Sequence, residues 1–275
     1  MHYSYIVILK SKYNFLLPYK VKNLKRYGRN FDGGYLICDD ISKSIDNLIT
    51  LGVGDDISFE LDFFKKRKLD KVCLYDYTVN HYLFIRIILK YLRRTLTFRS
   101  SINNFFYSIR NYLNFIVFVR NPKVFLKKKM VVKNIKKKNE INLNKIFLPL
   151  KGNKNLLKID IEGGEYTLID EIISKEKRIN TLILEFHWIN RNMKQFTKAV
   201  NTLKSKFDII HIHANNYRLI KKNEDFFDVI EMTFVNKTLN KVKNKFRYDF
   251  PIKGLDYECF PNHEKIKFSF SKKNF

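Results

Sequence analysis

The stretch that most constrains the fold is residues 155–169, where a strand, two acids, a glycine pair and a helix follow one another. Its apolar residues make a run of strand length: Leu156, Leu157, Ile159 and Ile161. Asp160 and Glu162 lie at the end of this run, where a strand buried on both faces normally carries no charge. Gly163-Gly164 breaks the strand, and apolar residues at helical spacing predict a helix from Glu165. This order is typical of the carboxyl edge of an open parallel sheet, where such folds bind ligands.

A second stretch of the same design lies earlier, at residues 47–60. Gly52 and Gly54 follow a short apolar strand there and would let the backbone turn tightly and approach a ligand. Residues 71–77 form the next predicted strand, which ends in Asp76. An acid at that position is placed to accept both ribose hydroxyls of a bound nucleoside. The third glycine of a dinucleotide-binding loop is missing, so the two glycines alone are weak evidence for a ligand site. The acids at three strand ends are stronger evidence for it.

Five segments together resemble the motif series of FkbM-type S-adenosylmethionine-dependent methyltransferases, in order and approximate spacing. They are Asp32-Gly-Gly-Tyr35, the run from Leu51 to Glu60, Tyr75-Asp-Tyr-Thr78, the run from Lys158 to Glu165, and Leu184-Glu-Phe-His187. The resemblance covers roughly residues 22–80 and 140–262. It implies a Rossmann-like methyltransferase fold with S-adenosylmethionine as cofactor. It also suggests O-methylation of a sugar or other small polar hydroxyl acceptor, often in surface-glycan or natural-product pathways.

The alternation of predicted strands and helices independently favours an α/β three-layer sandwich with a mostly parallel sheet. Residues 229–235 alternate apolar and polar side chains, which predicts an antiparallel edge strand. No low-complexity linker divides the chain. We therefore expect one methyltransferase domain over residues 1–275, with a basic, aromatic-rich insertion at about 81–135.

The predicted cofactor site takes its residues from the ends of these strands. Gly52 and Gly54 would pass under the cofactor, and Asp76 would hold its ribose. Asp55 or Asp160 would contact its amino-acid end. Tyr77, next to the ribose acid, completes the set.

The predicted acceptor site lies at the neighbouring strand ends. His187 is the most suitable general base near neutral pH, with Glu185, Asp160 and Glu162 as further catalytic candidates. The alternative is that His187 is only a hydrogen-bonded polar residue at a strand end and has no catalytic role. The residues that we expect to contact the acceptor are Asp32, Glu165, His213 and Asn215. We place His211 and His213 on opposite sides of their strand and favour His213, which lies nearer the strand end.

A metal ion is a further alternative, because Asp160, Glu162, Glu185, His187 and His213 could converge. Oxygen ligands with one or two imidazoles would suit Mg²⁺ or Mn²⁺. The ligand spacing is not that of a metal motif, and we do not expect a required metal.

The charge of the chain is concentrated in one segment. Residues 81–155 carry eighteen Lys or Arg and one acid, Glu140, and so contribute +17 to a formal net charge of +26. This excess is typical of an anionic partner, such as an anionic acceptor, a membrane surface or, less favoured, nucleic acid. A Lys- and Asn-rich composition on solvated faces would give the same excess.

Two other functions remain open from the sequence. One is an RNA-binding protein or RNA methyltransferase that uses the basic segment 81–155. The other is an NAD-dependent oxidoreductase or nucleotide-sugar enzyme, against which the missing glycine counts. Cys38, Cys73 and Cys259 have no paired spacing, and no apolar run reaches the length of a membrane span. We expect a cytoplasmic protein, with peripheral contact at the inner membrane surface as an open alternative.

Overall fold

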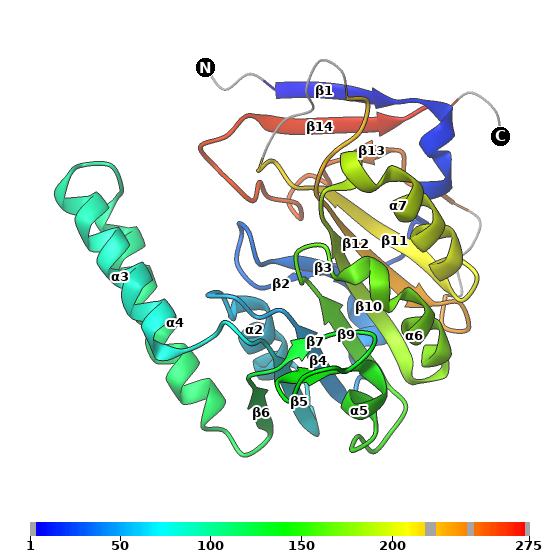
Figure 1. Cartoon of the computed structure of the whole chain (residues 1–275). Helices are drawn as coiled ribbons and strands as arrows, with labels where there is room; N and C mark the ends of the chain where they lie inside the picture. Colours follow the sequence, from blue (N-terminus) through cyan, green and yellow to red (C-terminus); the bar gives the residue numbers. More distant parts are fainter. Residues whose placement is uncertain (1–3, 218–223, 241–244, 273–275) are drawn as a thin grey trace.

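The computed structural model describes residues 4–217, 224–240 and 245–272, and a seven-stranded sheet forms its centre (Figure 1). The sheet order is β11-β12-β10-β9-β4-β5-β6. The bounds of these strands are β4 (Asn47–Leu51), β5 (Lys71–Tyr75), β6 (Val124–Lys127), β9 (Asn155–Ile159), β10 (Ile179–Phe186), β11 (Phe207–Ala214) and β12 (Ile230–Asn236).

The sheet is mostly parallel, as the sequence predicts, and β12 is antiparallel to both of its neighbours, β10 and β11. Its predicted place at the edge is wrong, because β11 lies outside it. The alternating polar residues of β12 suggested one face in water, yet all seven of its residues are buried. Their polar groups bond inside the protein instead: the Thr233 hydroxyl donates to the carbonyl of Leu36 at 2.7 Å, and Glu231 accepts from Cys259 at 3.3 Å.

Two apolar layers cover the sheet and make a three-layer sandwich. Alternate strand residues point to opposite faces. Leu48 and Leu156 therefore pack in the apolar cluster on the first face of the sheet, and Ile49 and Leu157 pack in the cluster on the second face. The helices that cover the second face are α5 (Leu143–Phe147), α6 (Ile169–Ser174) and α7 (Ile189–Leu203). On the first face lie α2 (Ser58–Lys66), α3 (His81–Leu96), α4 (Ile102–Val119) and the hairpin of β2 (Leu24–Tyr27) with β3 (Tyr35–Cys38), from which α1 (Asp39–Ser42) continues.

Helices α3 and α4 form a hairpin that extends away from the sheet (Figure 1). Asn80 caps the start of α3 by accepting from the backbone N–H of Leu83 at 2.9 Å. Phe84, Phe115 and Phe118 anchor the hairpin base in the core. After α4 the chain returns to the sheet as β6, so the predicted insertion at 81–135 divides between a protruding hairpin and a strand of the central sheet.

A second, three-stranded sheet joins segments from the two ends of the chain. β1 (Ser4–Leu9) pairs in parallel with β14 (Lys265–Phe270), which also pairs with β13 (Asp249–Phe250). β7 (Met130–Val131) and β8 (Glu140–Ile141) form a further short pair. Short 3₁₀ helices complete the described elements: η1 (Ser11–Leu16), η2 (Glu165–Leu168) and η3 (Glu176–Arg178). None of the helices in the described ranges is long and apolar enough to cross a membrane.

Candidate functional site

Acidic and imidazole side chains form a row across one edge of the sheet, because strand register aligns them. His213 on β11 is paired with Glu231 on β12, and Glu231 is paired with Glu185 on β10. Asp160 follows β9 directly beyond the pair Ile159–Leu184. The acids that the sequence places at separate strand ends therefore meet along one line.

A pocket of about 780 Å³ opens at the ends of β4, β5 and β9. All six residues predicted to bind the cofactor line it: Gly52, Gly54, Asp55, Asp76, Tyr77 and Asp160. Asp32 and Glu162, from the predicted acceptor and catalytic sets, line it as well. Residues 129–133, which no sequence pattern had linked to the site, form another wall. The volume is in the range of pockets that hold small molecules and cofactors.

Gly52 allows the backbone of β4 to pass close to the strand end of β9. Its φ is +80°, and a Cβ atom there would lie 1.6 Å from the carbonyl oxygen of Asp160. Gly54 also has a positive φ, +62°, but a Cβ atom there would meet nothing within 4 Å. The first glycine is thus required by contact as well as by backbone conformation, and the second by backbone conformation alone.

Asp76 holds the glycine loop in place. Its Oδ2 accepts from the backbone N–H groups of Val53 and Gly54, both at 2.9 Å, and its Oδ1 accepts from the N–H and hydroxyl of Thr78, both at 2.7 Å. Burial would raise the pKa of this carboxyl, but the hydrogen bonds outweigh burial and lower it. Both carboxylate oxygens of Asp76 thus already accept hydrogen bonds from the protein, and ribose hydroxyls would have to share them.

His187 lies among three carboxylates. Its Nε2 is 3.7 Å from Oδ1 of Asp160 and 3.6 Å from Oε1 of Glu185, while its Nδ1 is 3.4 Å from Oε1 of Glu165. Burial by itself would lower the pKa of His187, but Glu165 and Asp160 outweigh burial and raise it. As predicted from strand alternation, Glu185 and His187 point the same way. Both lie behind Asp160, which is the member of this group that reaches the pocket.

Two residues predicted to contact the acceptor instead support this group. Glu165 is fully buried and accepts from the backbone N–H groups of Gly163 and His187, both at 2.7 Å. The Asn215 amide donates to Oε1 of Glu185 at 3.2 Å. Burial, followed by the charges of Asp160 and Glu231, raises the pKa of Glu185 well above its usual range.

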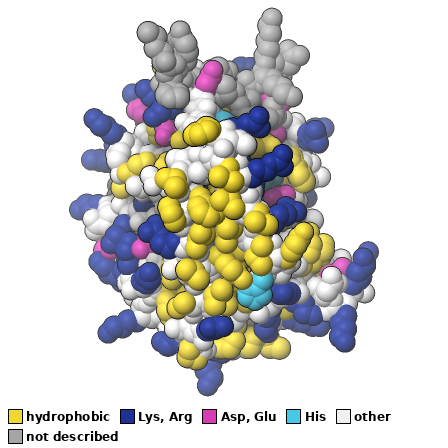
Figure 2. Space-filling model, turned by 90° about the vertical axis from the view of Figure 1, so that its left-hand side faces the viewer, with side chains coloured by type: hydrophobic (Ala, Val, Ile, Leu, Met, Phe, Trp, Pro, Cys, Tyr) yellow, Lys and Arg dark blue, Asp and Glu magenta, His cyan; other side chains and the backbone are white. Residues whose placement is uncertain are grey.

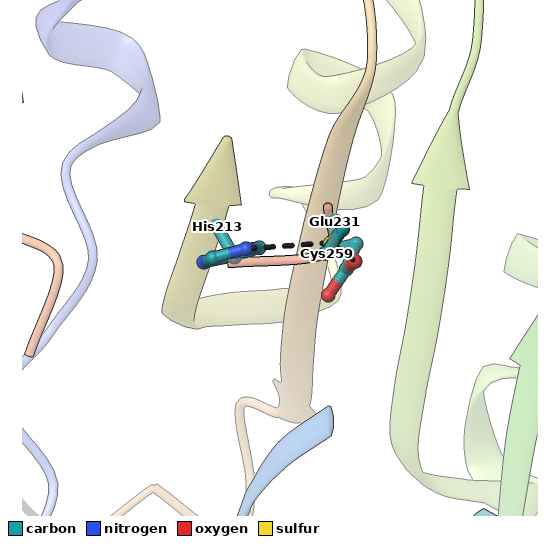
Figure 3. Close-up of side chains that lie close together, drawn as sticks. All are labelled: His213, Glu231 and Cys259. Atoms are coloured by element: carbon teal, nitrogen blue, oxygen red, sulfur yellow. Dashed lines mark hydrogen bonds between the residues drawn. The ribbon is translucent and has the colours of Figure 1, made fainter. Parts of the chain in front are cut away.

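His213 lies in a separate buried group with Glu231 and Cys259 (Figure 3). The Cys259 thiol donates to Oε1 of Glu231 at 3.3 Å, and its Sγ is 3.6 Å from Nε2 of His213. Burial lowers the pKa of His213 to about 4 and raises the pKa of Glu231 to about 8, so both are held in their neutral forms. The prediction that His211 and His213 face opposite sides is wrong, because residues two apart on a strand share a face. Both imidazoles approach Oδ1 of Asp256, at 3.0 Å and 3.7 Å.

Two groups among the described residues bring three metal-ligating side chains together. In the first, His213, Glu231 and Cys259, all ligand atoms lie within 4.8 Å of one another, and the sulfur suits zinc. In the second, Asp160, Glu185 and His187, the same spacing holds, and the two carboxylates suit Mg²⁺ or Mn²⁺. In the second group, however, the raised pKa of His187 favours an imidazolium that offsets the acids beside it.

Sequence reasoning missed an ion pair beside the pocket. Lys158 of β9 and Glu60 of α2 are both buried, with Nζ 3.2 Å from Oε1, and the Thr50 hydroxyl donates to the same oxygen at 3.1 Å. A lysine within the apolar run of β9 was the available signal, since buried lysines are rare unless paired.

A second missed contact joins the hairpin to the glycine loop. Arg29 Nη1 lies 2.9 Å from Oδ2 of Asp56, and the Tyr107 hydroxyl of α4 donates to the same oxygen at 3.0 Å. The Asn111 amide donates to the backbone carbonyl of Asp55. Helix α4 is therefore bonded to a loop that lines the pocket.

Comparison with solved structures finds weak likenesses at TM-scores below 0.5. A precorrin-6Y C5,15-methyltransferase from Geobacter metallireducens shares 12% identity, with a TM-score of 0.35 over 72% of this chain and 85% of that one. A spermidine synthase from Thermotoga maritima shares 10% identity, with a TM-score of 0.39 over 76% and 63%. A dimethyladenosine transferase from Plasmodium falciparum shares 11% identity, with a TM-score of 0.35 over 75% and 63%. No curated protein sequence matches significantly.

The family comparison is decisive where these likenesses are not. The methyltransferase FkbM domain matches residues 39–232, which include the glycine loop, the row of acids and the protruding hairpin. This match covers well over half of the chain and contains every residue that lines the pocket except Asp32, Gly33 and Tyr35. The family and the fold imply S-adenosylmethionine as the cofactor. The chain belongs to the FkbM family of methyltransferases and is an S-adenosylmethionine-dependent enzyme.

Proposed function

We propose that this methyltransferase transfers the methyl group to a hydroxyl of a sugar or other small polar acceptor. The observation that carries the proposal is the position of Asp160. Its carboxylate lines the cofactor pocket, next to the tight turn at Gly52, and His187 lies directly behind it. A hydroxyl must lose its proton as it attacks, and this pair is placed to receive that proton beside the cofactor.

The residues of the pocket suit S-adenosylmethionine. A Cβ atom at Gly54 would meet nothing within 4 Å, so the loop leaves open space there for a ligand, and the exposed ring of Tyr77 offers a flat surface to a base. When bound, the cofactor supplies an electrophilic methyl on a sulfonium. Asp55 would hold its cationic amino group, and the backbone around Gly52 and Gly54 would pass beneath it.

The acceptor would be held between the cofactor and Asp160. Glu165 accepts from the backbone N–H of His187. The Asn215 amide donates to Oε1 of Glu185 and the Tyr35 hydroxyl donates to its Oε2, so the group is positioned before the acceptor arrives. The raised pKa of Glu185 favours its protonated form, which reduces the negative charge behind Asp160. The proton then moves from the acceptor hydroxyl to Asp160 or His187 as the new carbon–oxygen bond forms.

The test combines cofactor binding with methyl transfer. We expect S-adenosylmethionine and its demethylated product to raise the melting temperature, by an amount that grows with ligand concentration. A panel of nucleotide sugars, free glycosides and short RNA, assayed with methyl-labelled cofactor, identifies the acceptor class. Binding of NAD without S-adenosylmethionine binding would contradict the cofactor, and labelled RNA without labelled sugars would contradict the acceptor. Full activity after chelator treatment is expected, because Asp160 and His187 offer acceptors for the hydroxyl proton without a metal.

A further inference from the structure

The outer surface of the α3–α4 hairpin carries an apolar band (Figure 2). Its large side chains are between 45% and 97% exposed: Tyr82, Ile85, Leu89, Leu96, Phe98, Ile102, Phe106, Leu113 and Val117. On each helix they recur at helical spacing, so they form one stripe per helix. Phe98, at the turn between the helices, is 97% exposed. A contiguous patch of this kind on a monomer marks an interaction surface.

Basic side chains border this apolar band, as the dark blue atoms on both sides of it show (Figure 2). The hairpin's exposed cations are Arg86, Lys90, Arg93, Arg94, Arg99, Arg110 and Arg120. The sequence has no acid between residues 81 and 139. An apolar face with a basic border is the pattern of elements that lie in a membrane interface rather than across it.

We propose that the α3–α4 hairpin docks on an anionic lipid surface, with its apolar band in the headgroup–acyl boundary and its cations among the headgroups. A second copy of this chain fits less well, because it would bring two acid-free basic surfaces together. Nucleic acid would satisfy the cations and stack on Phe98 or Phe106, but it would leave Ile85, Leu89, Leu113 and Val117 without an apolar partner. Lipid matches both the charge and the aliphatic side chains.

A groove beside the band offers a place for an anionic headgroup. It has a volume of about 490 Å³ and lies between α4 and the loop after β2. Arg110, Asn103 and Asn104 line it together with the rings of Phe31 and Phe106. Arg29 lines it too, with its guanidinium already paired with Asp56. Guanidinium and amide donors are the groups that bind phosphate oxygens.

The docking surface is connected to the cofactor pocket. Tyr107 and Asn111, on the same helix as the apolar band, bond to Asp56 and Asp55 of the glycine loop. A protein held at a lipid surface by this hairpin would keep its pocket near that surface. The proposal does not depend on which acceptor is methylated.

Sedimentation with lipid vesicles tests the proposal. Vesicles of phosphatidylcholine alone are compared with vesicles that contain about one-third phosphatidylglycerol, over a range of salt concentrations. We expect the protein to bind the anionic vesicles at least about tenfold more tightly, and to lose affinity as salt rises. The triple variant Leu89→Ser, Phe98→Ser and Leu113→Ser keeps every charge and should bind about tenfold or more weakly. Arg86→Glu with Arg93→Glu should also weaken binding by at least about tenfold.

Matched controls distinguish docking of the hairpin from nonspecific association with vesicles. Leu148→Ser removes an exposed apolar residue outside the hairpin, and Lys194→Glu with Lys198→Glu reverses two exposed charges on α7. Both should bind vesicles like the unaltered protein, and every variant should keep its melting temperature and S-adenosylmethionine affinity. Equal weak binding to both vesicle types would overturn the proposal. So would anionic binding that is unaffected by the triple serine variant, or serine-sensitive binding to RNA without vesicle binding.

Discussion

Two glycines in one loop have different physical roles, although the sequence shows them as one Gly-x-Gly unit. At Gly52 a side chain would collide with the Asp160 carbonyl, and relief would require β4 and β9 to move apart. At Gly54 the space is open and only the positive φ opposes a side chain. Both positions have a positive φ, so a side chain at Gly52 has a contact cost in addition to the conformational cost that it shares with Gly54.

Gly52→Ala should give an insoluble protein or one whose melting temperature falls steeply, because backbone cannot yield as a flexible side chain can. Gly54→Ala should cost only about 1–2 kcal/mol, the usual penalty for a left-handed residue. Urea unfolding of both variants measures the difference. Equal losses at the two positions would show that contact with Asp160 does not limit the loop.

We propose that His187 and Asp160 together accept the proton of the acceptor hydroxyl. The pH dependence of turnover tests whether His187 is the general base. The carboxylates around His187 raise its pKa above the ordinary value of 6.5. A general base must be unprotonated, so turnover should rise with pH through this raised pKa and then level off. Below that pH the imidazolium cannot accept the acceptor's proton.

His187→Gln should lower single-turnover methyl transfer by about 10²–10⁴-fold and flatten the pH profile, with cofactor affinity nearly unchanged. Leu148→Ser, distant from the pocket, is the matched control for folding and assay quality. If the rate stays within a few-fold of the unaltered protein, His187 is a positioning residue. Asp160→Asn should then abolish the reaction, because Asp160 is the group that reaches the pocket.

At the scale of elements, the Lys158–Glu60 pair joins β9 to α2 directly under the pocket. Both side chains are almost wholly buried, and Lys158 also lies 5.0 Å from the ring centroid of Tyr35. Burial would lower the pKa of Lys158, but Glu60 and Asp160 outweigh it and raise that pKa. The lysine therefore favours its charged form, which offsets the negative charge of Glu60 and Asp160.

Lys158→Met should destabilise the protein by about 3–5 kcal/mol, because it leaves the Glu60 charge buried without a partner. The double variant Lys158→Met with Glu60→Gln should recover part of that loss, since no buried charge remains. Denaturant unfolding of the single and double variants measures the coupling. A double variant that is no more stable than the single one would show that packing, not charge, sets the cost.

The α3–α4 hairpin has one part buried in the core and another part exposed. The hairpin base contributes Phe84, Phe115 and Phe118 to the core, whereas its outer face presents the apolar band to its surroundings. A periodic apolar stripe predicts a helix but not what the stripe contacts. The sequence could therefore identify both helices as amphipathic without showing that one apolar face is left open.

At the scale of the whole molecule, a strongly basic exterior surrounds an acidic site. The formal net charge is +26, yet Asp32, Asp160, Glu185 and Glu231 lie together at the sheet edge. A net charge this far from zero destabilises the compact state by self-repulsion, and salt screens that repulsion.

The melting temperature of the protein without ligand should therefore rise as sodium chloride increases from low to physiological ionic strength. Differential scanning calorimetry in a weakly interacting buffer measures this directly. A sodium sulfate series at matched ionic strength checks whether specific anion binding contributes. A melting temperature that falls with added salt would mean that attractive surface pairs outweigh the general repulsion.

The sequence alone determined the layered α/β class, the glycine loop and the meeting of acids at one sheet edge. These features depend on local periodicity and turn chemistry, and parallel strands bring their carboxyl ends to the same edge whatever their order. All six predicted cofactor residues accordingly line one pocket.

Only the tertiary structure decided which of those acids are available to a ligand and which are used by the chain. Asp76 accepts from the glycine loop, Glu165 turns inward to His187, and His213 pairs with Cys259 far along the chain. The same holds for β12, which lies one place inside the edge because β11 pairs beyond it. Such partners are set by register and packing between distant segments, and neither leaves a periodic signal in the sequence.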